Sequence, residues 1–232
     1  MQLMWARAIT LAIALLTSAV SAASASCRLA LLLALDISSS VDFQEDAMQR
    51  GGLARALQSD PVVEAILSVP DQTVALAVFE WSGRYQQDLI MDWVALSNEA
   101  DIRSAASVIA ASQRSYAEFP TALGYALGHA ASLLSAAPQC DEVVIDVSGD
   151  GVNNEGFPPA LAYKNFDLSE VTVNGLAIQG GKDDIAEYYK RELIRGPGAF
   201  VEVAQSFEDF ERVMQRKLIR ETQAQIFSSL DR

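Results

Sequence analysis

Residues 31–41 read LLLALDISSSV, and this stretch decides the fold class. Its apolar part belongs to a short, nearly continuous hydrophobic run at residues 28–36. Such a run is typical of a strand that is buried on both faces of a parallel sheet. The strand ends on a carboxylate, Asp36, and serines follow at positions 38 to 40. A polar loop of this composition indicates a binding site at the end of the strand.

Segments with strand and helix character alternate along the rest of the chain. Further strands are expected, in chain order, at residues 73–81, 87–94, 142–147, 171–178 and 199–203. Helices are expected at residues 41–59, 61–67, 98–112, 121–137, 158–166, 183–194 and 207 to about 227. A tight turn at Ser82-Gly83 separates the first two of those strands, which favours an antiparallel hairpin. The alternation predicts an α/β fold: a doubly wound, mostly parallel sheet with one antiparallel edge strand and helices on both faces.

The composition agrees with one globular domain. The chain has 232 residues, of which 50% are hydrophobic and 20% are charged, and this is enough to bury a core. We find no linker, internal repeat or low-complexity segment in residues 26–232, and we expect them to form a single domain. The formal net charge is −13. Because an acidic chain repels phosphate backbones and anionic lipid, nucleic acid is not an expected partner.

The first 25 residues have the layout of a secretory signal peptide. Arg7 is their only charged residue, an apolar run follows at residues 8–20, and Ala23-Ser24-Ala25 offers a cleavage site. A membrane anchor is an alternative, but it would need an apolar run of about 20 residues. Lipid attachment at Cys27 is a second alternative, but residues 24–26 lack the leucine that usually precedes a lipid-bearing cysteine. We therefore expect an exported protein, periplasmic or extracellular, with no stable membrane span after cleavage.

Oxygen-bearing side chains gather where the predicted strands end. In open α/β sheets, ligands bind at the carboxyl ends of the strands. Asp36, Ser38 and Ser40 leave the first strand there, Asp150 follows a later strand, and Thr121 precedes a helix. Hard divalent cations such as Mg²⁺ take oxygen ligands. These side chains therefore offer oxygen ligands that would suit such a cation; a serine-rich helix cap without metal is the alternative.

The order of these residues resembles the von Willebrand factor type A domain. That family carries a metal-ion-dependent adhesion site, written as Asp-x-Ser-x-Ser, then a Thr on a later loop, then an Asp-Gly after the fourth strand. The matching positions in this chain are Asp36, Ser38, Ser40, Thr121 and Asp150. The chain also resembles a group of exported bacterial proteins with this domain whose function is unassigned.

The resemblance covers residues 28–227 and departs from the family at two positions. The family usually has Gly before its Thr, and this chain has Pro120. The family usually has Thr before its second Asp, and this chain has Gly149. Neither departure removes an expected ligand.

The resemblance implies a role for each residue. Ser38 and Ser40 would bind the cation through their hydroxyls, and Asp36 and Asp150 would hold it mainly through ordered water. Thr121 would bind directly or through water, and a partner protein's Asp or Glu carboxylate would take the last position. The implied function is a non-catalytic, metal-dependent protein-binding module. Mg²⁺ is the expected cation, with Mn²⁺ or Ca²⁺ as alternatives. A structural envelope subunit with a degenerate site and a metal-dependent hydrolase are the alternative functions.

The chain has two cysteines, Cys27 and Cys140, which are candidates for a disulfide in an exported protein. The resemblance implies that their strands are parallel neighbours. Cys27 lies nine residues before Asp36 and Cys140 ten before Asp150, so both would lie away from the metal. Neighbouring strands are about 4.8 Å apart, a separation that a disulfide tolerates. We therefore expect a Cys27–Cys140 bridge.

Several other features have simpler explanations. A calcium-loop pattern starts at Asp146 but ends on Phe157, where a bidentate Glu is needed, so Asp146 is expected to be a buried, hydrogen-bonded carboxylate. The one histidine, His129, has no nucleophile motif beside it and is expected to be structural. Residues 153–156 are expected to be a solvent loop at the rim of the site. Core aromatic residues are expected at Trp81, Trp93, Tyr188 and Tyr189. The final helix is expected to present a solvated basic face made of Arg212, Arg216, Lys217 and Arg220.

Overall fold

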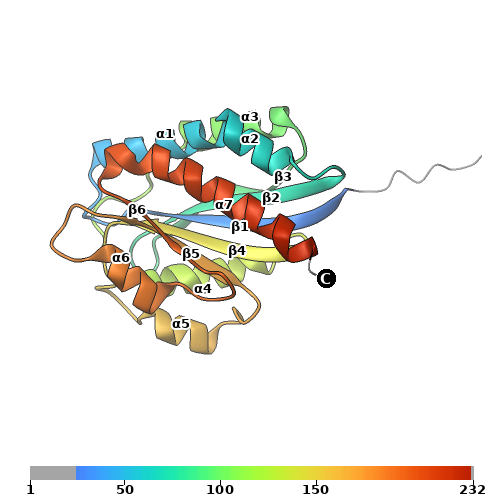
Figure 1. Ribbon diagram of the computed structural model, residues 1–232. Coiled ribbons are helices and arrows are strands. Elements are labelled where there is room, and N and C mark those ends of the chain that lie inside the picture. The colour runs from blue at the N-terminus through green and yellow to red at the C-terminus, as the bar shows by residue number, and fades with distance from the viewer. Residues whose placement is uncertain (1–24, 231–232) are drawn as a thin grey trace, which may run out of the picture.

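The computed structural model describes residues 25–230, with side chains described up to residue 223, so the expected signal peptide lies outside it. Six strands form one sheet in the order β3-β2-β1-β4-β5-β6 (Figure 1). Every neighbouring pair is parallel except β2 and β3, which form the predicted antiparallel pair at the edge. The strands are β1 (Ser26–Asp36), β2 (Gln72–Trp81), β3 (Gln87–Leu96), β4 (Cys140–Gly149), β5 (Thr172–Ile178) and β6 (Val201–Ala204).

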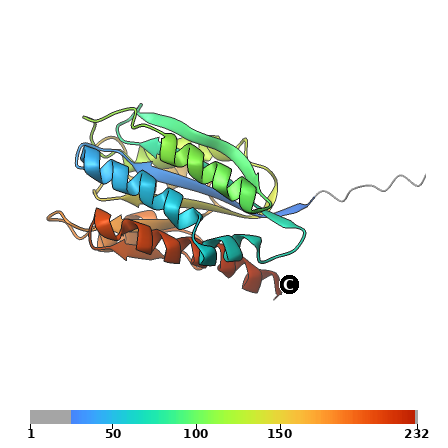
Figure 2. The same ribbon diagram turned by 90° about the horizontal axis from the view of Figure 1, so that it is seen from above.

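Helices cover both faces of the sheet, as predicted. One face carries α1, α2, α3 and α7, which lie side by side in Figure 2, and the other carries α4, α5 and α6 (Figure 1). The bounds are α1 (Phe43–Leu57), α2 (Asp60–Leu67), α3 (Glu99–Ala111), α4 (Leu123–Leu134), α5 (Pro159–Asn165), α6 (Ile185–Tyr188) and α7 (Phe210–Leu230).

The apolar run of β1 is explained by its place in the middle of the sheet. Its odd-numbered leucines, Leu29 to Leu35, pack into the core beneath α1 and α7. Leu32 and Ala34 pack into the core of the opposite face. Because successive side chains of a strand point to opposite faces, a strand covered on both sides is apolar at every position. Asp36 continues the even-numbered side.

Helix boundaries follow local signals and differ from the prediction in two places. α1 begins after Asp42, whose carboxylate accepts hydrogen bonds from the N–H groups of Gln44 and Glu45, while the Glu45 carboxylate accepts from the N–H of Asp42. The single helix expected at 183–194 is a short α6 that continues into a π-helical turn, Tyr189–Leu193. The final α-helix starts later than expected, because a 3₁₀ turn, Phe207–Asp209, precedes it.

The final helix was predicted to present a solvated basic face, and this prediction is wrong for Lys217. The three arginines of that group are largely exposed, but Lys217 is fully buried. Its ammonium nitrogen lies 3.2 Å from Asp146 Oδ1 and 2.8 Å from Glu221 Oε1. Asp146 is buried on β4, as expected, and supplies the opposite charge. The sequence alone does not show that these residues meet, because β4 and α7 are far apart in the chain.

The two cysteines form the expected disulfide. Cys27 and Cys140 are direct partners in the register of β1 and β4, and their Cα atoms are 4.5 Å apart. The bridge joins the amino ends of the two strands, whereas Asp36 ends β1 and Asp150 follows β4. The disulfide and the candidate site therefore lie at opposite ends of the sheet. No helix within residues 25–230 is long and apolar enough to cross a membrane.

Candidate metal centre

Four of the five expected ligands meet at the carboxyl ends of β1 and β4. Ser40 Oγ donates a 2.7 Å hydrogen bond to Asp150 Oδ1. The hydroxyl oxygens of Ser38 and Ser40 lie 3.1 Å apart, and the Ser38 N–H donates to Asp36 Oδ1 at 2.7 Å. Because Ser40 donates to the carboxylate, Ser38 is the donor in the hydroxyl pair. A continuous set of side-chain oxygens thus connects two segments that are 110 residues apart.

Asp36 is fully buried, as is Ser38. The Asp36 side chain is inaccessible to solvent, and its Oδ2 has no hydrogen-bond partner among the residues that the structure describes. Burial raises the pKa of Asp36 to about 8, and the nearby charge of Asp150 contributes to the increase. Burial also raises the pKa of Asp150. A cation between the two carboxyl groups would favour their ionised forms.

Thr121 lies beside this group on a separate loop. It is buried, and a Cβ placed on Gly151 would lie 3.0 Å from Thr121 Oγ1, so the hydroxyl is next to the residue that follows Asp150. Asn154 holds the loop in place: its Oδ1 accepts from the Thr121 N–H at 2.9 Å, and its own N–H donates to the Thr121 carbonyl at 3.0 Å. Asn154 belongs to the segment expected to be a solvent loop, and its bracing role was missed.

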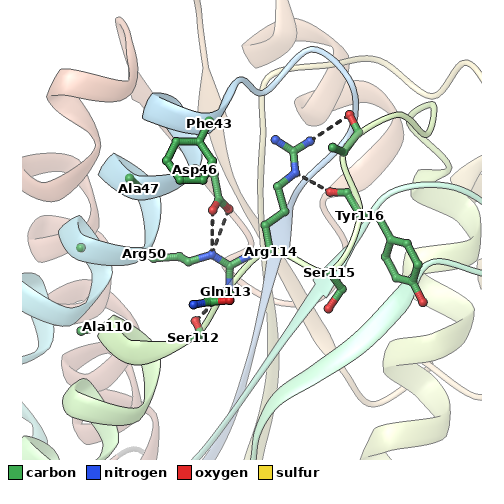
Figure 3. Close-up of a pocket in the computed structure, with 12 residues that line it drawn as sticks. Phe43, Asp46, Ala47, Arg50, Ala110, Ser112, Gln113, Arg114, Ser115 and Tyr116 are labelled. Atoms are coloured by element: carbon green, nitrogen blue, oxygen red, sulfur yellow. Dashed lines mark hydrogen bonds and ion pairs between the residues drawn. The ribbon is translucent and has the colours of Figure 1, made fainter.

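Arg114 holds the loop after β1 through hydrogen bonds to its backbone carbonyls. The Arg114 guanidinium donates to the carbonyl oxygens of Ile37 and Ser38 at 2.6 and 2.9 Å, and to that of Val41 at 2.6 Å. It also donates to the carbonyl of Tyr116, towards which it points in Figure 3. Sequence reasoning missed Arg114, and no motif marks it, because the carbonyls that it holds in the loop after β1 are more than 70 residues away.

The segment that carries Arg114 is itself anchored by a buried ion-pair cluster. Arg50 on α1 contacts Asp46 at 2.9 Å and also pairs with Glu80, and all three side chains are buried. Arg50 donates to Ser112 Oγ at 2.9 Å, and Glu80 accepts from the Ser115 N–H at 2.8 Å. Asp46, Arg50, Ser112 and Ser115 line a pocket of about 570 Å³ together with Arg114 (Figure 3). The cluster therefore connects α1 to the loop that supports the candidate site.

The donor set fits a hard divalent cation. Two carboxylates and three hydroxyls supply only oxygen, which suits Mg²⁺, Mn²⁺ or Ca²⁺ better than softer metals. Asp36 Oδ2 is a buried acceptor without a hydrogen-bond partner among the described residues, and it belongs to this set of oxygen ligands. Within residues 25–230, no three His, Cys, Asp or Glu side chains form a metal-ligand cluster. A site here would therefore depend on its serine and threonine hydroxyls as much as on its carboxylates.

The sheet order and the loops at its carboxyl end define a von Willebrand factor type A fold. Proximal thread matrix protein 1 from the mussel byssus has a similar structure, with a TM-score of 0.63 and 14% identity over 85% of this chain and 49% of that one. A second structure of that protein, described as having a zinc-occupied MIDAS motif, has a TM-score of 0.62 and 16% identity over 85% and 48%. A von Willebrand factor type A protein from Catenulispora acidiphila has a TM-score of 0.59 and 14% identity over 85% and 43%.

This chain belongs to the family described as "Protein of unknown function (DUF1194)", whose model matches residues 26–226. No curated protein matches the sequence. The chain spans about half the length of the solved chains named above. At these identities the structural similarity shows the fold alone, so the function must be argued from the residues of the site.

Proposed function

We propose that this chain is an exported, non-catalytic module that binds a partner protein's Asp or Glu carboxylate through a divalent cation. Mg²⁺ is the proposed cation, and the proposed ligands are Asp36, Ser38, Ser40, Thr121 and Asp150. The observation that carries the proposal is the direct contact between Ser40 and Asp150, which joins the two halves of the site. The cation supplies a positive centre to which a carboxylate can coordinate.

The chemistry of the ligands suits this role. Three of the proposed ligands are neutral hydroxyl groups, those of Ser38, Ser40 and Thr121. Because neutral hydroxyls are weak metal ligands, they leave most of the positive charge of a bound cation uncompensated. Asp36 and Asp150 supply negative charge, but burial disfavours their ionised forms in the absence of a cation. A further carboxylate from a partner is therefore a favourable ligand for the cation.

The surroundings of the site make the cation necessary for such a partner. A pocket of about 390 Å³ opens beside Ser40 and Asp150, and Asp42, Glu45 and Glu208 line it. The chain as a whole carries a formal net charge of −13. Without a cation, this acidic surface would repel an incoming carboxylate. Binding is therefore expected to depend strictly on the metal.

Two further findings support export and adhesion. The Cys27–Cys140 disulfide suits an oxidising compartment, which agrees with the signal peptide expected at residues 1–25. Similar folds occur in the pilus adhesin SpaC of Lactobacillus rhamnosus GG, at 15% identity and a TM-score of 0.59. A hydrolase is a weaker proposal, because the one histidine, His129, lies within α4 and packs its ring against Phe79 of β2, so it is explained as a structural residue rather than as a general base.

The proposal is tested by capture from an envelope extract with the immobilised chain. We expect the wild-type chain to retain a partner in Mg²⁺ and to release it in chelator, and Ser40→Ala to retain none. Ser39→Ala is the matched control, because Ser39 lies in the same loop with an exposed side chain. Amidation of the carboxyl groups in the extract should abolish capture by every variant.

Two results would contradict the proposal. Capture that persists unchanged in chelator and in Ser40→Ala would indicate a structural subunit whose site binds no metal. Capture that survives amidation of the extract would show that the partner is not held through a carboxylate.

A further inference from the structure

A buried tyrosine, Tyr189, reaches the candidate site from the face of the sheet that α4, α5 and α6 cover. Tyr189 begins the π-helical turn that follows α6, and it is inaccessible to solvent. Turns of this kind are rare and often occur at functional sites. Tyr189 is part of the core on the face covered by α4, α5 and α6. The expectation that this aromatic residue lies in the core is confirmed, but its hydroxyl needs a separate explanation.

Two glycines make the space that the Tyr189 side chain occupies. A Cβ placed on Gly175 of β5 would lie 2.7 Å from Tyr189 Cδ2, and a Cβ placed on Gly149 of β4 would lie 2.5 Å from the Tyr189 hydroxyl. Gly175 pairs with Val147 in the register of β4 and β5, so both glycines face the same side of the sheet. The tyrosine ring lies over β5, and its hydroxyl ends at β4. Any other residue at either position would obstruct it.

The Tyr189 hydroxyl ends beside Asp36. The same Cβ position on Gly149 would lie 2.7 Å from Asp36 Oδ2, so the hydroxyl and the carboxylate oxygen are neighbours around one point. Both atoms are buried, and neither has a hydrogen-bond partner among the described residues. A phenylalanine would fill the same space without the penalty of burying an unpaired hydroxyl. A buried donor and a buried acceptor side by side indicate a shared role.

We propose that the Tyr189 hydroxyl donates a hydrogen bond, directly or through one water molecule, to Oδ2 of Asp36 and holds this carboxylate in position for the cation. Tyr189 is thus a positioning residue, and its effect on metal binding rests on the proposed function. The arrangement also gives a physical reason for Gly149, which stands where the von Willebrand factor type A family usually has a threonine. The side chain of a threonine at 149 would occupy the space that the Tyr189 hydroxyl takes here.

The neighbouring Tyr188 supports the same region. Its hydroxyl accepts a hydrogen bond from the N–H of Asn153 at 3.2 Å, on the loop that follows Asp150. Consecutive tyrosines at the junction of α6 and the π-helical turn therefore reach both carboxylate-bearing segments of the site. The Tyr188 hydroxyl bonds to a backbone N–H, whereas the Tyr189 hydroxyl reaches a proposed ligand.

The contact is tested first in the metal-free chain, where the proposed metal function plays no part. A double-mutant cycle of Tyr189→Phe with Asp36→Ala is measured by urea unfolding in chelator. We expect the combined effect on the unfolding equilibrium constant to differ from the product of the single effects by about fivefold or more. Tyr163→Phe with Asp36→Ala is the matched control, since the half-buried Tyr163 hydroxyl donates to the Leu193 carbonyl and should give an additive cycle. Additive behaviour in both cycles would overturn the contact.

The positioning role is tested by Mn²⁺ titration followed by electron paramagnetic resonance. We expect Tyr189→Phe to weaken Mn²⁺ binding about tenfold or more, as loss of a hydrogen bond to a metal ligand does, and Tyr163→Phe to leave it unchanged. Equal affinity of Tyr189→Phe and the wild type would overturn the role. A wild-type chain that takes up no Mn²⁺ would remove the metal function, while the cycle would still decide whether Tyr189 and Asp36 interact.

Discussion

Ser40, on the loop after β1, donates a hydrogen bond from its hydroxyl to the carboxylate of Asp150, which follows β4. The distance from Ser40 Oγ to Asp150 Oδ1 is 2.7 Å. The two residues are 110 positions apart in the chain and meet because β1 and β4 are parallel neighbours. Parallel strands bring their carboxyl ends to one edge of the sheet. This contact places two serine hydroxyls and two carboxylates in one group, and it is the structural basis of the proposed metal-dependent adhesion.

Arg114 is expected to control the affinity of the site without contacting the cation. Arg114→Ala removes the hydrogen bonds to the carbonyls of Ile37, Ser38 and Val41, so the loop that carries the serines loses its support. We expect Mn²⁺ affinity to fall about tenfold or more. Arg103→Ala is the control, because Arg103 is exposed and pairs with Glu99 on its own helix. The prediction fails if the two variants bind Mn²⁺ equally well.

The stability of the metal-free chain should depend on pH through Asp36. Its pKa is about 8 in the folded chain, against an ordinary value of 3.8. Between these values the folded state keeps on Asp36 a proton that the unfolded state has lost, so the contribution of Asp36 to stability is greatest at low pH and decreases as the pH rises towards 8. Asp36→Asn cannot ionise and should lose less stability between about pH 5 and pH 8. Urea unfolding in chelator measures this; equal losses in both proteins would contradict it.

The buried charges around Lys217 should be sensitive to the loss of one partner. Lys217→Met leaves Asp146 and Glu221 as buried carboxylates without their cation. We expect the free energy of unfolding to fall by about 3–5 kcal/mol. Arg212→Met on the same helix is the control, since Arg212 is exposed and should change stability by less than about 0.5 kcal/mol. Urea unfolding at neutral pH compares the two variants, and similar values for both would rule out this account of the cluster.

The disulfide should stabilise the fold without affecting the site. We expect the double variant Cys27→Ser with Cys140→Ser to lose about 2–5 kcal/mol of unfolding free energy, because the bridge closes a long loop. Its Mn²⁺ affinity should equal that of the wild type, since Cys27 lies nine strand positions before Asp36, which is a distance of about 30 Å. A large loss of Mn²⁺ affinity in the folded double variant would show that the two ends of the sheet are coupled.

The parts of the fold that depend on local pattern could be predicted from the sequence. The apolar run of β1, the turn at Ser82-Gly83 and the periodic pattern at residues 98–112 each have a short-range signal. The structure confirms the elements that they indicate, β1, the β2–β3 pair and α3, which Asn98 caps. The meeting of the five site residues was expected from their positions at strand ends and from the family resemblance. Their role as metal ligands stays a prediction.

The features that could not be predicted depend on contacts between distant segments. Lys217 looks like one of several basic residues on a surface helix, and only the position of Asp146 on β4 explains its burial. Arg114 and Asn154 act through backbone groups, which leave no pattern in the sequence. Tyr189 was expected to be a core residue, and its hydroxyl gains meaning only when Gly149 and Asp36 are seen around it.

The most direct test of the central claim is a titration of the chain with Mn²⁺, followed by electron paramagnetic resonance, for the wild type, Ser39→Ala and Ser40→Ala. The account predicts saturable uptake of a single ion by the wild type and by Ser39→Ala, and binding by Ser40→Ala that is weaker by about tenfold or more. Absence of uptake by the wild type at millimolar Mn²⁺, or equal affinity of the two serine variants, would contradict it.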